Sequence, residues 1–326
     1  MENLAHLTFG CEFEVFFPNN PRHRFGELSA SAEVTRRTGF RWDIHGDGSI
    51  RDNTGSRSGI EFVSPVLRGQ SGLDQVAAVA NALRDMGAQV NASCGFHVHV
   101  GAAGNDLTFF KNLVKLYASY EREIDEVMPV SRRNNNAGFC RSLTNVNFAV
   151  IDRATSLRGL ISEVARSAGA GTDRYVKLNL AAMDRHQTVE FRQHSGTVDA
   201  VKAVNWIIRC LQLVTAAKEG NVAAAPQIAR DYARFAFKTR VVIEMISRPE
   251  GATTAELCAR AGARRMGVKR HARLAGFGYR KRGKRYFMVT HSDAPVVSKP
   301  LDEVLNATAE QREFWNQRRE ALRRAR

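Results

Sequence analysis

The sequence contains no long hydrophobic run: no segment approaches the roughly 20 apolar residues that a membrane-spanning helix needs. Its start, MENLAHLTFG, shows neither the basic region nor the apolar stretch of a signal peptide. Internal repeats and low-complexity tracts are also absent from the sequence. Of the 326 residues, 44% are hydrophobic and 25% are charged, as is typical of globular proteins. We therefore expect a soluble protein without a membrane partner, long enough for two domains.

Cysteine is scarce and shows no pairing pattern. The five cysteines are an odd number, lie far apart and form no Cys-x-x-Cys motif. Such spacing argues against a disulfide framework and against a cysteine zinc site. It favours buried thiols in a reducing compartment, so we expect a cytoplasmic protein. The cysteines are Cys11, Cys94, Cys140, Cys210 and Cys258.

Three short segments alternate between apolar and reactive side chains. They are residues 7–16 with Glu12 and Glu14, residues 96–100 with His97 and His99, and residues 188–192 with Glu190 and Arg192. Because successive side chains of a strand point to opposite faces, each reactive pair shares one face while its apolar neighbours face the core. A lone Glu-x-Glu is usually a solvated face, and a lone His-x-His is more often structural than a ligand pair. Gathered on one sheet, however, these charges need a cation to neutralise them, and the pattern predicts a shared functional site.

The first two thirds of the sequence predict a sheet with helices packed on it. Strand signals include residues 41–50, with a turn at 46–49, and residues 60–63. Helical spacing covers residues 71–87, with Ser71 as the N-cap, and residues 106–127, 157–168 and 199–219. Residues 18–39 are predicted to be loop. Alternating strands separated by amphipathic helices favour an α+β fold, an antiparallel sheet backed by helices.

Positive charge gathers in the last quarter of the chain. The net charge is +15, and residues 236–326 hold 21 Lys and Arg against nine Asp and Glu. Short helices at residues 241–245, 255–261 and 263–274, followed by a basic hairpin at 279–289, predict a winged helix-turn-helix. Such a charge distribution favours a polyanion, and we expect nucleic acid as a partner. The candidate contacts are Arg264, Arg265, Lys269, Arg270, Arg280, Lys281, Arg282, Lys284 and Arg285.

These features divide the chain into three expected parts. Residues 1–235 form a catalytic domain, residues 236–292 form the winged-helix module, and residues 293–326 form a basic helical tail. The alternative for the basic module is docking, in which it packs on the catalytic domain or on a partner protein and its charges are only solvated.

Six motifs carry a family resemblance. In chain order they are FGCEFEVF, GDGSI, GIEFVSPVL, CGFHVHVG, RYVKLNL and TVEFRQHSGTVDAVKAVNWI. Over about residues 7–217 they resemble the phage and bacterial amidoligase family of the glutamine-synthetase and glutamate–cysteine-ligase superfamily. The resemblance implies a curved, glutamine-synthetase-like sheet and an ATP-dependent carboxylate–amine ligase. In such a reaction ATP phosphorylates a carboxylate, and an amine then displaces phosphate from the acyl phosphate to form an amide.

The resemblance also implies two metal positions. Glu12, His97 and Glu190 match the ligands of one divalent ion, and Glu14 with Glu61 matches the ligands of another. Mg²⁺ prefers oxygen ligands of this kind, and the histidine leaves Mn²⁺ open as well. The third carboxylate of the second position is not obvious from the sequence; Glu2, Glu27 and Asp52 are only candidates for it.

Other matching positions imply contacts to ATP and the substrates. His99 faces the ATP phosphates, and Arg192, counted as catalytic with Glu61, stabilises the transferred phosphoryl group. Asp47 holds or deprotonates the amine, or else only caps its own turn. The remaining candidates, which are Arg132, Arg141 and Asn179, bind nucleotide or substrate in this reading. Their alternatives are a solvated basic loop for the arginines and a buried strand-end amide for Asn179.

Some features leave other interpretations open. Glutamine synthetases carry an arginine two residues before the metal-binding glutamate of the last motif, where this chain has Thr188. A His-x-His with a distant glutamate is also compatible with a cupin-type iron site, although that reading leaves Glu12, Glu14, Glu61 and Arg192 without a role. A third alternative is a DNA-binding protein whose ligase-like domain is inactive. The acid and amine substrates cannot be read from the sequence, and a homo-oligomer is compatible with it.

Overall fold

The structure, a computed structural model, describes residues 4–18, 27–220, 237–246, 250–275, 278–289 and 300–324. The chain divides into two compact units. The first unit comprises Met1–Val222 together with Pro300–Arg326, and the second comprises Ala223–Lys299. In chain order, the second unit is therefore inserted between two segments of the first. Each unit is described below by itself.

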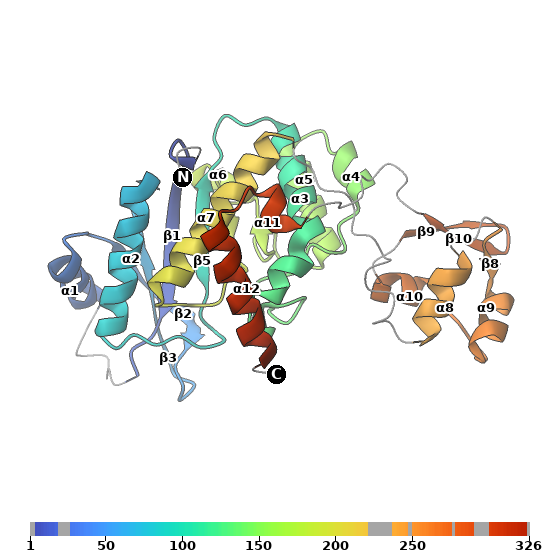
Figure 1. The fold of residues 1–326 in the computed structure, drawn as a ribbon, viewed down its shortest axis with the longest axis horizontal. Helices are drawn as coiled ribbons and strands as arrows, with labels where there is room; N and C mark the ends of the chain where they lie inside the picture. Colours follow the sequence, from blue (N-terminus) through green and yellow to red (C-terminus); the bar gives the residue numbers. More distant parts are fainter. Residues whose placement is uncertain are drawn as a thin grey trace. The chain divides into compact units, whose positions relative to one another are not determined.

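One antiparallel sheet organises the first unit (Figure 1). Its strand order is β2-β3-β1-β5-β7-β6, and β4 also pairs with β1. The strands are β1 (Thr8–Val15), β2 (Asp43–Arg51), β3 (Arg57–Val63), β4 (Leu67–Arg68), β5 (Phe96–Gly101), β6 (Leu178–Asn179) and β7 (Thr188–Phe191). The three segments that alternate in sequence thus lie side by side as β1, β5 and β7.

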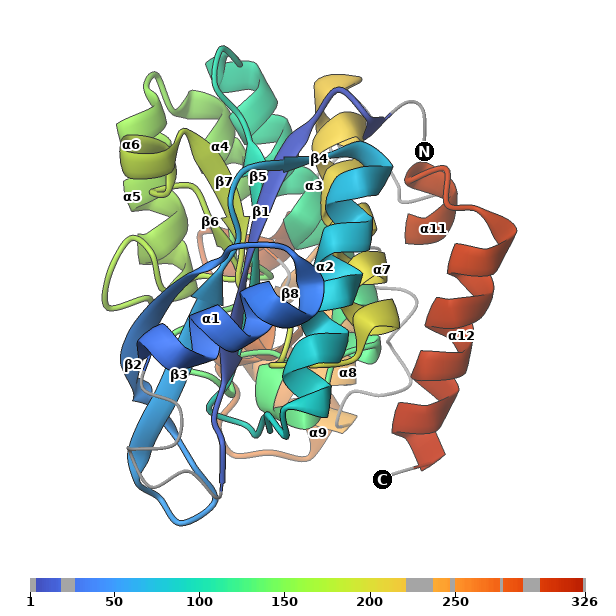
Figure 2. The same cartoon turned by 90° about the vertical axis from the view of Figure 1, so that its left-hand side faces the viewer.

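Three long helices pack together against this sheet: α2 (Gly69–Asp85), α3 (Leu107–Glu126) and α7 (Ala200–Lys218). Figure 2 shows them on one side of the strands. The alternating apolar residues of β1 and β5 are fully buried, including Phe9, Phe13, Phe96 and Val98. The sequence prediction of an antiparallel sheet backed by helices is confirmed.

Smaller helices complete the first unit. The predicted helices at residues 106–127, 157–168 and 199–219 are confirmed, because α3, α5 and α7 agree with them to within a residue at each end. Asp106, Ser156 and Asp199 cap the three helices by accepting hydrogen bonds from backbone N–H groups of the first turn. The smaller elements are α1 (Glu27–Thr38), a 3₁₀ turn (Val130–Arg132), α4 (Phe148–Arg153), α5 (Leu157–Ala168) and α6 (Met183–His186).

The sequence prediction is wrong in three places. Residues 27–38, expected to be loop, form α1, because Ala30 and Val34 lie one helical turn apart and are fully buried. Residues 46–49 form no separate turn but an irregular part of β2, whose pairing with β3 shifts between Asp47 and Arg51. Ser71 is not an N-cap, because strand β4 leads directly into α2 at Gly69, which has a positive φ of 58°.

The C-terminal segment packs on the first unit as two helices, α11 (Leu301–Val304) and α12 (Ala309–Arg324). Asp302 forms an ion pair with Arg209, a buried residue of α7. The same guanidinium lies over the ring of Trp315, 4.2 Å from its centroid. Arg318 Nε donates to the carbonyl of Val127 at 2.8 Å. Residues 300–324 therefore pack on α7, and the segment expected to be a basic helical tail belongs to the first unit.

Helix α7 is long and apolar enough, by length and composition, to cross a membrane, and it is the one such helix among the described residues. Most of it is buried inside the first unit, as is usual for the core helix of a folded domain. We attach no membrane role to it.

The second unit has its own small core. Its elements are α8 (Phe237–Ile246), β8 (Ala252–Thr253), α9 (Thr254–Ala261), α10 (Val268–Ala275), β9 (Gly278–Arg282) and β10 (Arg285–Val289). The strands form a sheet in the order β8-β10-β9. Val242, Leu257 and Val268 belong to one buried cluster that joins the helices. Thr253 and Glu256 cap α9 reciprocally, and α10 begins at Val268 and not at residue 263.

The packing of α11 predicts a large effect of Asp302→Ala on stability. Arg209 is 2% exposed, and burial lowers its pKa to about 10 although Asp302 acts in the opposite direction. Removing Asp302 leaves a buried charge without its ion-pair partner, so we expect a loss of about 3 kcal/mol in the free energy of unfolding. Urea unfolding followed by tryptophan fluorescence measures this, because all three tryptophans, Trp42, Trp206 and Trp315, belong to the first unit.

Glu320→Ala is the matched control. Glu320 also pairs with an arginine, Arg324, but both side chains are largely exposed. Exposed pairs contribute about 0–1 kcal/mol. Equal losses in the two variants would show that α11 is not anchored through this buried charge.

Candidate metal and ligand site

The pairing register of the sheet gathers the candidate ligands on one face. Residues that are directly opposite in an antiparallel pair have neighbouring side chains on the same face. The opposed pairs are Glu12 with His97, Glu14 with Glu61, His99 with Glu190, and Asn179 with Glu190. Five adjacent strands, from β3 to β6 along the sheet order, thus contribute to one cluster.

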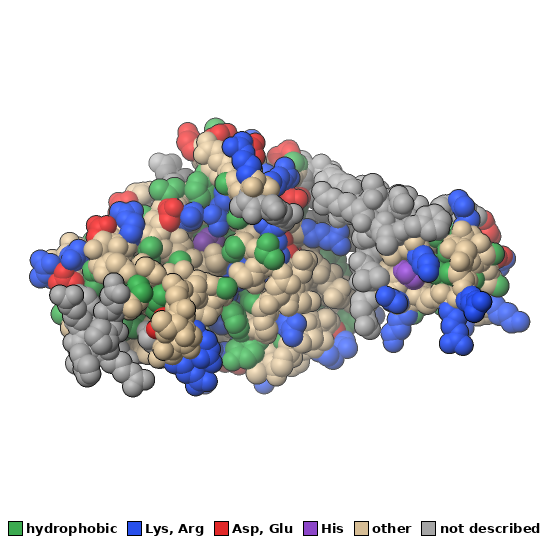
Figure 3. All heavy atoms as spheres, turned by 90° about the horizontal axis from the view of Figure 1, so that it is seen from below, with side chains coloured by type: hydrophobic (Ala, Val, Ile, Leu, Met, Phe, Trp, Pro, Cys, Tyr) green, Lys and Arg blue, Asp and Glu red, His purple; other side chains and the backbone are tan. Residues whose placement is uncertain are grey.

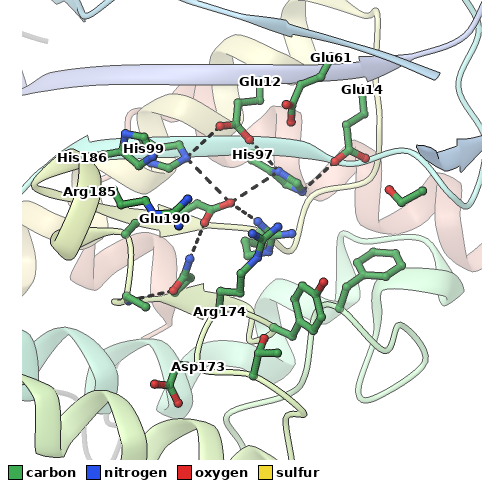
Figure 4. A pocket seen from close by; sticks show the side chains of 18 of the residues that line it. Glu12, Glu14, Glu61, His97, His99, Asp173, Arg174, Arg185, His186 and Glu190 are labelled. Atoms are coloured by element: carbon green, nitrogen blue, oxygen red, sulfur yellow. Dashed lines mark hydrogen bonds and ion pairs between the residues drawn. The ribbon is translucent and has the colours of Figure 1, made fainter. Parts of the chain in front are cut away.

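The first group of ligands is Glu12, His97 and Glu190, whose ligand atoms all lie within 4.8 Å of one another. His97 Nδ1 lies 3.0 Å from Glu12 Oε2 and 3.6 Å from Glu190 Oε1. His99 Nε2 lies 3.3 Å from Glu12 Oε1 and therefore borders this group. Figure 4 shows these side chains converging from three strands.

The second group is Glu14, Glu61 and His97, again within 4.8 Å. His97 Nε2 lies 3.6 Å from Glu14 Oε1, so the two ring nitrogens of His97 face the two groups. The sequence did not suggest His97 as the third ligand here. Gly95 makes the arrangement possible, since a Cβ at this position would lie only 2.5 Å from His97 Nε2.

Of the third ligands that the sequence suggested, only Asp52 lies wholly within the described residues, and it does not supply the ligand. Asp52 accepts hydrogen bonds from Thr54 and Ser56 in its own turn and does not line the cavity. Glu2 and the side chain of Glu27 lie outside the described residues.

The electrostatics of the cluster fit a cation. Burial and the neighbouring Glu12 and Glu14 raise the pKa of Glu61 to about 8. Burial also opposes ionisation of Glu12, but hydrogen bonds from His97 and His99 outweigh it and lower the pKa of that carboxyl. Carboxylates this close repel one another unless a positive charge lies between them. Four carboxylates and a histidine are a donor set that suits Mg²⁺ or Mn²⁺, so the residues present fit a divalent metal.

Polar neighbours fix the orientation of the cluster. An Arg192 Nη1–H group donates to Glu190 Oε1, and Asn179 Nδ2 donates to Glu190 Oε2 at 2.6 Å. His99 Nδ1 lies 2.8 Å from the hydroxyl of Thr188. Thr188, which stands where the resemblance implied an arginine, therefore orients His99 so that its Nε2 faces Glu12 and Glu190.

The cluster forms part of the lining of a cavity of about 860 Å³. Asp47 also lines this cavity, and its Oδ1 accepts a hydrogen bond from the N–H of Ser49 at 2.7 Å, so it both caps its loop and faces the site. The sequence analysis missed five other lining residues. They are Phe139, Arg174, Tyr175, Arg185 and His186, and the ring of His186 lies against that of His99, with centroids 5.6 Å apart. The available signal was position: Arg174 opens the RYVKLNL motif, and Arg185-His186 comes just before strand β7.

Two candidate arginines do not line the cavity. Arg132 is buried, donates to the carbonyl of Cys94 and lies 5.0 Å from the ring centroid of Phe139. Arg141 pairs through its backbone with Tyr175 and Lys177. Both arginines therefore hold loops whose other residues, Phe139 and Tyr175, line the cavity.

The candidate nucleic-acid residues lie around α10 and the β9–β10 hairpin. Arg285 is engaged, because it pairs with Glu256 at 2.9 Å and donates to two backbone carbonyls. The side chain of Arg280 lies outside the described part of the chain. The remaining candidates are exposed: Arg264, Arg265, Lys269, Arg270, Lys281, Arg282 and Lys284.

Comparison with known proteins gives one family. A family model described as "Putative amidoligase enzyme" matches residues 6–214. Among solved structures, the chain is similar to a glutamine synthetase from Plasmodium falciparum determined by cryoEM, at 10% identity and a TM-score of 0.38. That match covers 98% of this chain and 72% of the other, and we base no argument on a likeness of this size. No curated protein matches the chain.

The raised pKa of Glu61 predicts how stability depends on pH when divalent metal is absent. Its pKa is about 8 in the folded protein and about 4.5 when unperturbed, so the folded state holds the proton more tightly. The stability that this proton contributes to the folded state is fully present below about pH 4.5 and is lost as the pH rises through 8. In EDTA, tryptophan-detected urea unfolding should therefore show falling stability of the first unit between about pH 5 and pH 8.

Glu61→Gln should flatten this dependence, because glutamine has no proton to lose. Glu320→Gln, on the exposed face of α12, should leave it unchanged. The same slope in Glu61→Gln and in the wild-type protein would show that another group causes it.

Proposed function

The chain belongs to the amidoligase family whose model matches residues 6–214, and we propose that it is an ATP-dependent carboxylate–amine ligase. The observation that supports this most directly is the pair of ligand groups that share His97. Phosphoryl transfer depends mainly on positioning and charge neutralisation. Cations held by two adjoining sets of carboxylates that line a cavity would provide both.

The proposed reaction has two steps. The terminal phosphoryl group of ATP is transferred to an oxygen of the substrate carboxylate, which gives an acyl phosphate and ADP. The amine nitrogen then attacks the acyl carbon, the bond to the phosphate oxygen breaks, and the amine loses a proton. The products are an amide, ADP and phosphate.

Each residue of the site has a role in this proposal. Glu12 and Glu190 would hold one divalent ion, Glu14 and Glu61 would hold another, and His97, which has one free lone pair when neutral, would ligate one of the two. These ions would supply positive charge to the phosphate oxygens. His99 and Arg192 donate hydrogen bonds to the phosphoryl group in transfer, and Thr188 keeps His99 directed at it. Asp47 holds the amine and accepts its proton. Asn179 is a buried strand-end amide that donates to Glu190 and accepts from the N–H of Ala181, so its role is to orient Glu190. Arg132 and Arg141 act indirectly, through the loops that they hold.

The geometry of the site also argues against the cupin-type alternative. An iron site of His97, His99 and Glu190 would leave Glu14 and Glu61 unused, although both adjoin His97. Carboxylates that repel one another are costly to keep without a charge between them. We therefore favour the ligase.

Loss of single metal ligands should abolish ligation. Glu12→Gln, His97→Ala and Glu190→Gln each remove charge or a lone pair from one group, and we expect at least about a hundredfold lower activity. The measurement is mass spectrometry of amides formed from mixed acids and amines with ATP and Mg²⁺, together with ADP release. Glu320→Gln should retain full activity.

Two outcomes would contradict the proposal. Full turnover in all three ligand variants would mean that the chemistry lies elsewhere in the molecule. Folded wild-type protein that releases no ADP and forms no amide with any acid or amine would favour the alternative of an inactive ligase-like domain.

A second candidate function rests on the second unit. The order α8, β8, α9, α10, β9, β10 is that of a winged helix, and we propose that the unit binds duplex DNA through α10 and the β9–β10 hairpin. Seven exposed cations lie on these elements and on the loop before α10, and no ion pair joins them to any residue within the described ranges. Figure 3 shows lysine and arginine side chains projecting from this unit.

Binding to DNA should depend strongly on salt. If about six of the cations meet phosphates, the logarithm of affinity should fall with the logarithm of salt concentration at a slope of about −5. We expect Lys269→Glu with Arg270→Glu to weaken binding of the full chain, and Arg312→Glu with Arg324→Glu, an equal change of net charge on α12, to leave it nearly unchanged. Fluorescence anisotropy with duplex DNA at two salt concentrations measures both. Absence of binding near 50 mM salt would remove DNA from the partners and favour the docking alternative.

A further inference from the structure

The lining of the cavity carries charges of both signs. Glu12, Glu14 and Glu61 come from the adjacent strands β1 and β3. Arg174 and Arg185 come from the loop before β6 and from α6, where Asp173 and Asp184 also line the cavity. Figure 4 shows Arg174 and Arg185 extending into the cavity towards Glu190, whereas the carboxylate of Asp173 points away from it.

The acidic residues beside these arginines are engaged elsewhere. Asp173 and Asp184 each precede one of the two arginines in sequence, and both pair with Arg158 of α5, at 3.6 Å and 3.3 Å. Arg158 therefore balances the two aspartates from outside the cavity. Arg174 instead lies over the ring of Tyr175, 5.3 Å from its centroid.

Glu190 cannot neutralise the arginines either. Arg192 and Asn179 already bind its two oxygens. Neither Arg174 nor Arg185 has an ion-pair partner within the ranges that the structure describes. Two guanidinium groups therefore line a cavity without an ion-pair partner among the residues that the structure describes.

We infer that Arg174 and Arg185 bind an anionic oxygen group of a ligand in the part of the cavity beside Glu190. A planar guanidinium donates two parallel hydrogen bonds to a carboxylate or a phosphate, which gives the geometry as well as the charge. The inference rests on the proposed ligase and adds the chemistry of its ligand: one negatively charged group bound by these two arginines. Tyr175 and His186 line the cavity as well.

Two kinds of ligand carry such a group. It is either the polyphosphate of the nucleotide or a second carboxylate on the acid substrate. The experiment uses tripolyphosphate with Mg²⁺ for the first and glutarate for the second. Butyrate, which has a single carboxylate, is the reference for glutarate.

Isothermal titration calorimetry on the full chain measures binding without requiring turnover. We expect Arg174→Ala and Arg185→Ala each to weaken binding of one probe about tenfold, the usual effect of losing one charged hydrogen-bond donor. Arg166→Ala is the matched control, because Arg166 is an equally exposed arginine of the first unit that pairs with Glu163 outside the cavity. Thermal midpoints without ligand should be unchanged in all three variants.

The outcomes separate the possibilities. Weakened binding of tripolyphosphate identifies a phosphate, and weakened binding of glutarate but not of butyrate identifies a second carboxylate. If neither probe binds, or if both arginine variants bind as tightly as the wild type, the inference is overturned. The rise of the thermal midpoint with Mg²⁺ in the same samples reports on the carboxylate groups alone, so failure of this inference is distinguishable from failure of the proposed ligase.

Discussion

Strand β1 lies between β3 and β5, and its pairing register brings Glu12, Glu14 and Glu61 together beside His97. Because strand side chains alternate, a slip of one residue would move Glu12 and Glu14 into the helical layer and expose Phe13. The apolar face prevents such a slip. Phe9, Cys11 and Phe13 are almost completely buried, and each large apolar side chain contributes about 1.5–3 kcal/mol when it leaves water. Burial on one face of the strand therefore holds together, on the other face, carboxylates that repel one another.

A second network fixes the other end of the site. Lys177 is fully buried between two residues of α3, with Nζ 2.8 Å from Glu121 Oε1 and 2.6 Å from Asp125 Oδ1. Its backbone carbonyl accepts a hydrogen bond from the N–H of Arg192 at 2.9 Å. Burial of charges is costly unless all of them are paired, and here they are. Helix α3 thus positions the residue that binds Glu190.

The sequence was most informative where local periodicity alone decides the structure. Alternation identified β1, β5 and β7 and the face that each presents, because a strand places its residues the same way whatever its partner. It could not show that Glu14 lies opposite Glu61 or that His97 lies between two ligand groups, since these depend on which strands pair and in what register. Arg174 and Arg185 were missed for a similar reason: they lie in a loop and in a four-residue helix, whose positions follow from packing and from Arg158. Helix α1 was missed because, within residues 29–38, its buried side consists of Ala30 and Val34 alone.

The insertion of the second unit between α7 and α11 sets an order of events during synthesis. A ribosome makes residues 223–299 before it makes the segment that covers α7, and at about 5–20 residues per second this takes about 4–15 s. During that interval Arg209 and Trp206 have been made, but Asp302 and Trp315 have not. The candidate metal ligands are already present in the nascent chain, whereas the outer side of the helical layer is still open to solvent. The first unit therefore completes its fold after the second unit has been synthesised, although most of its residues come first.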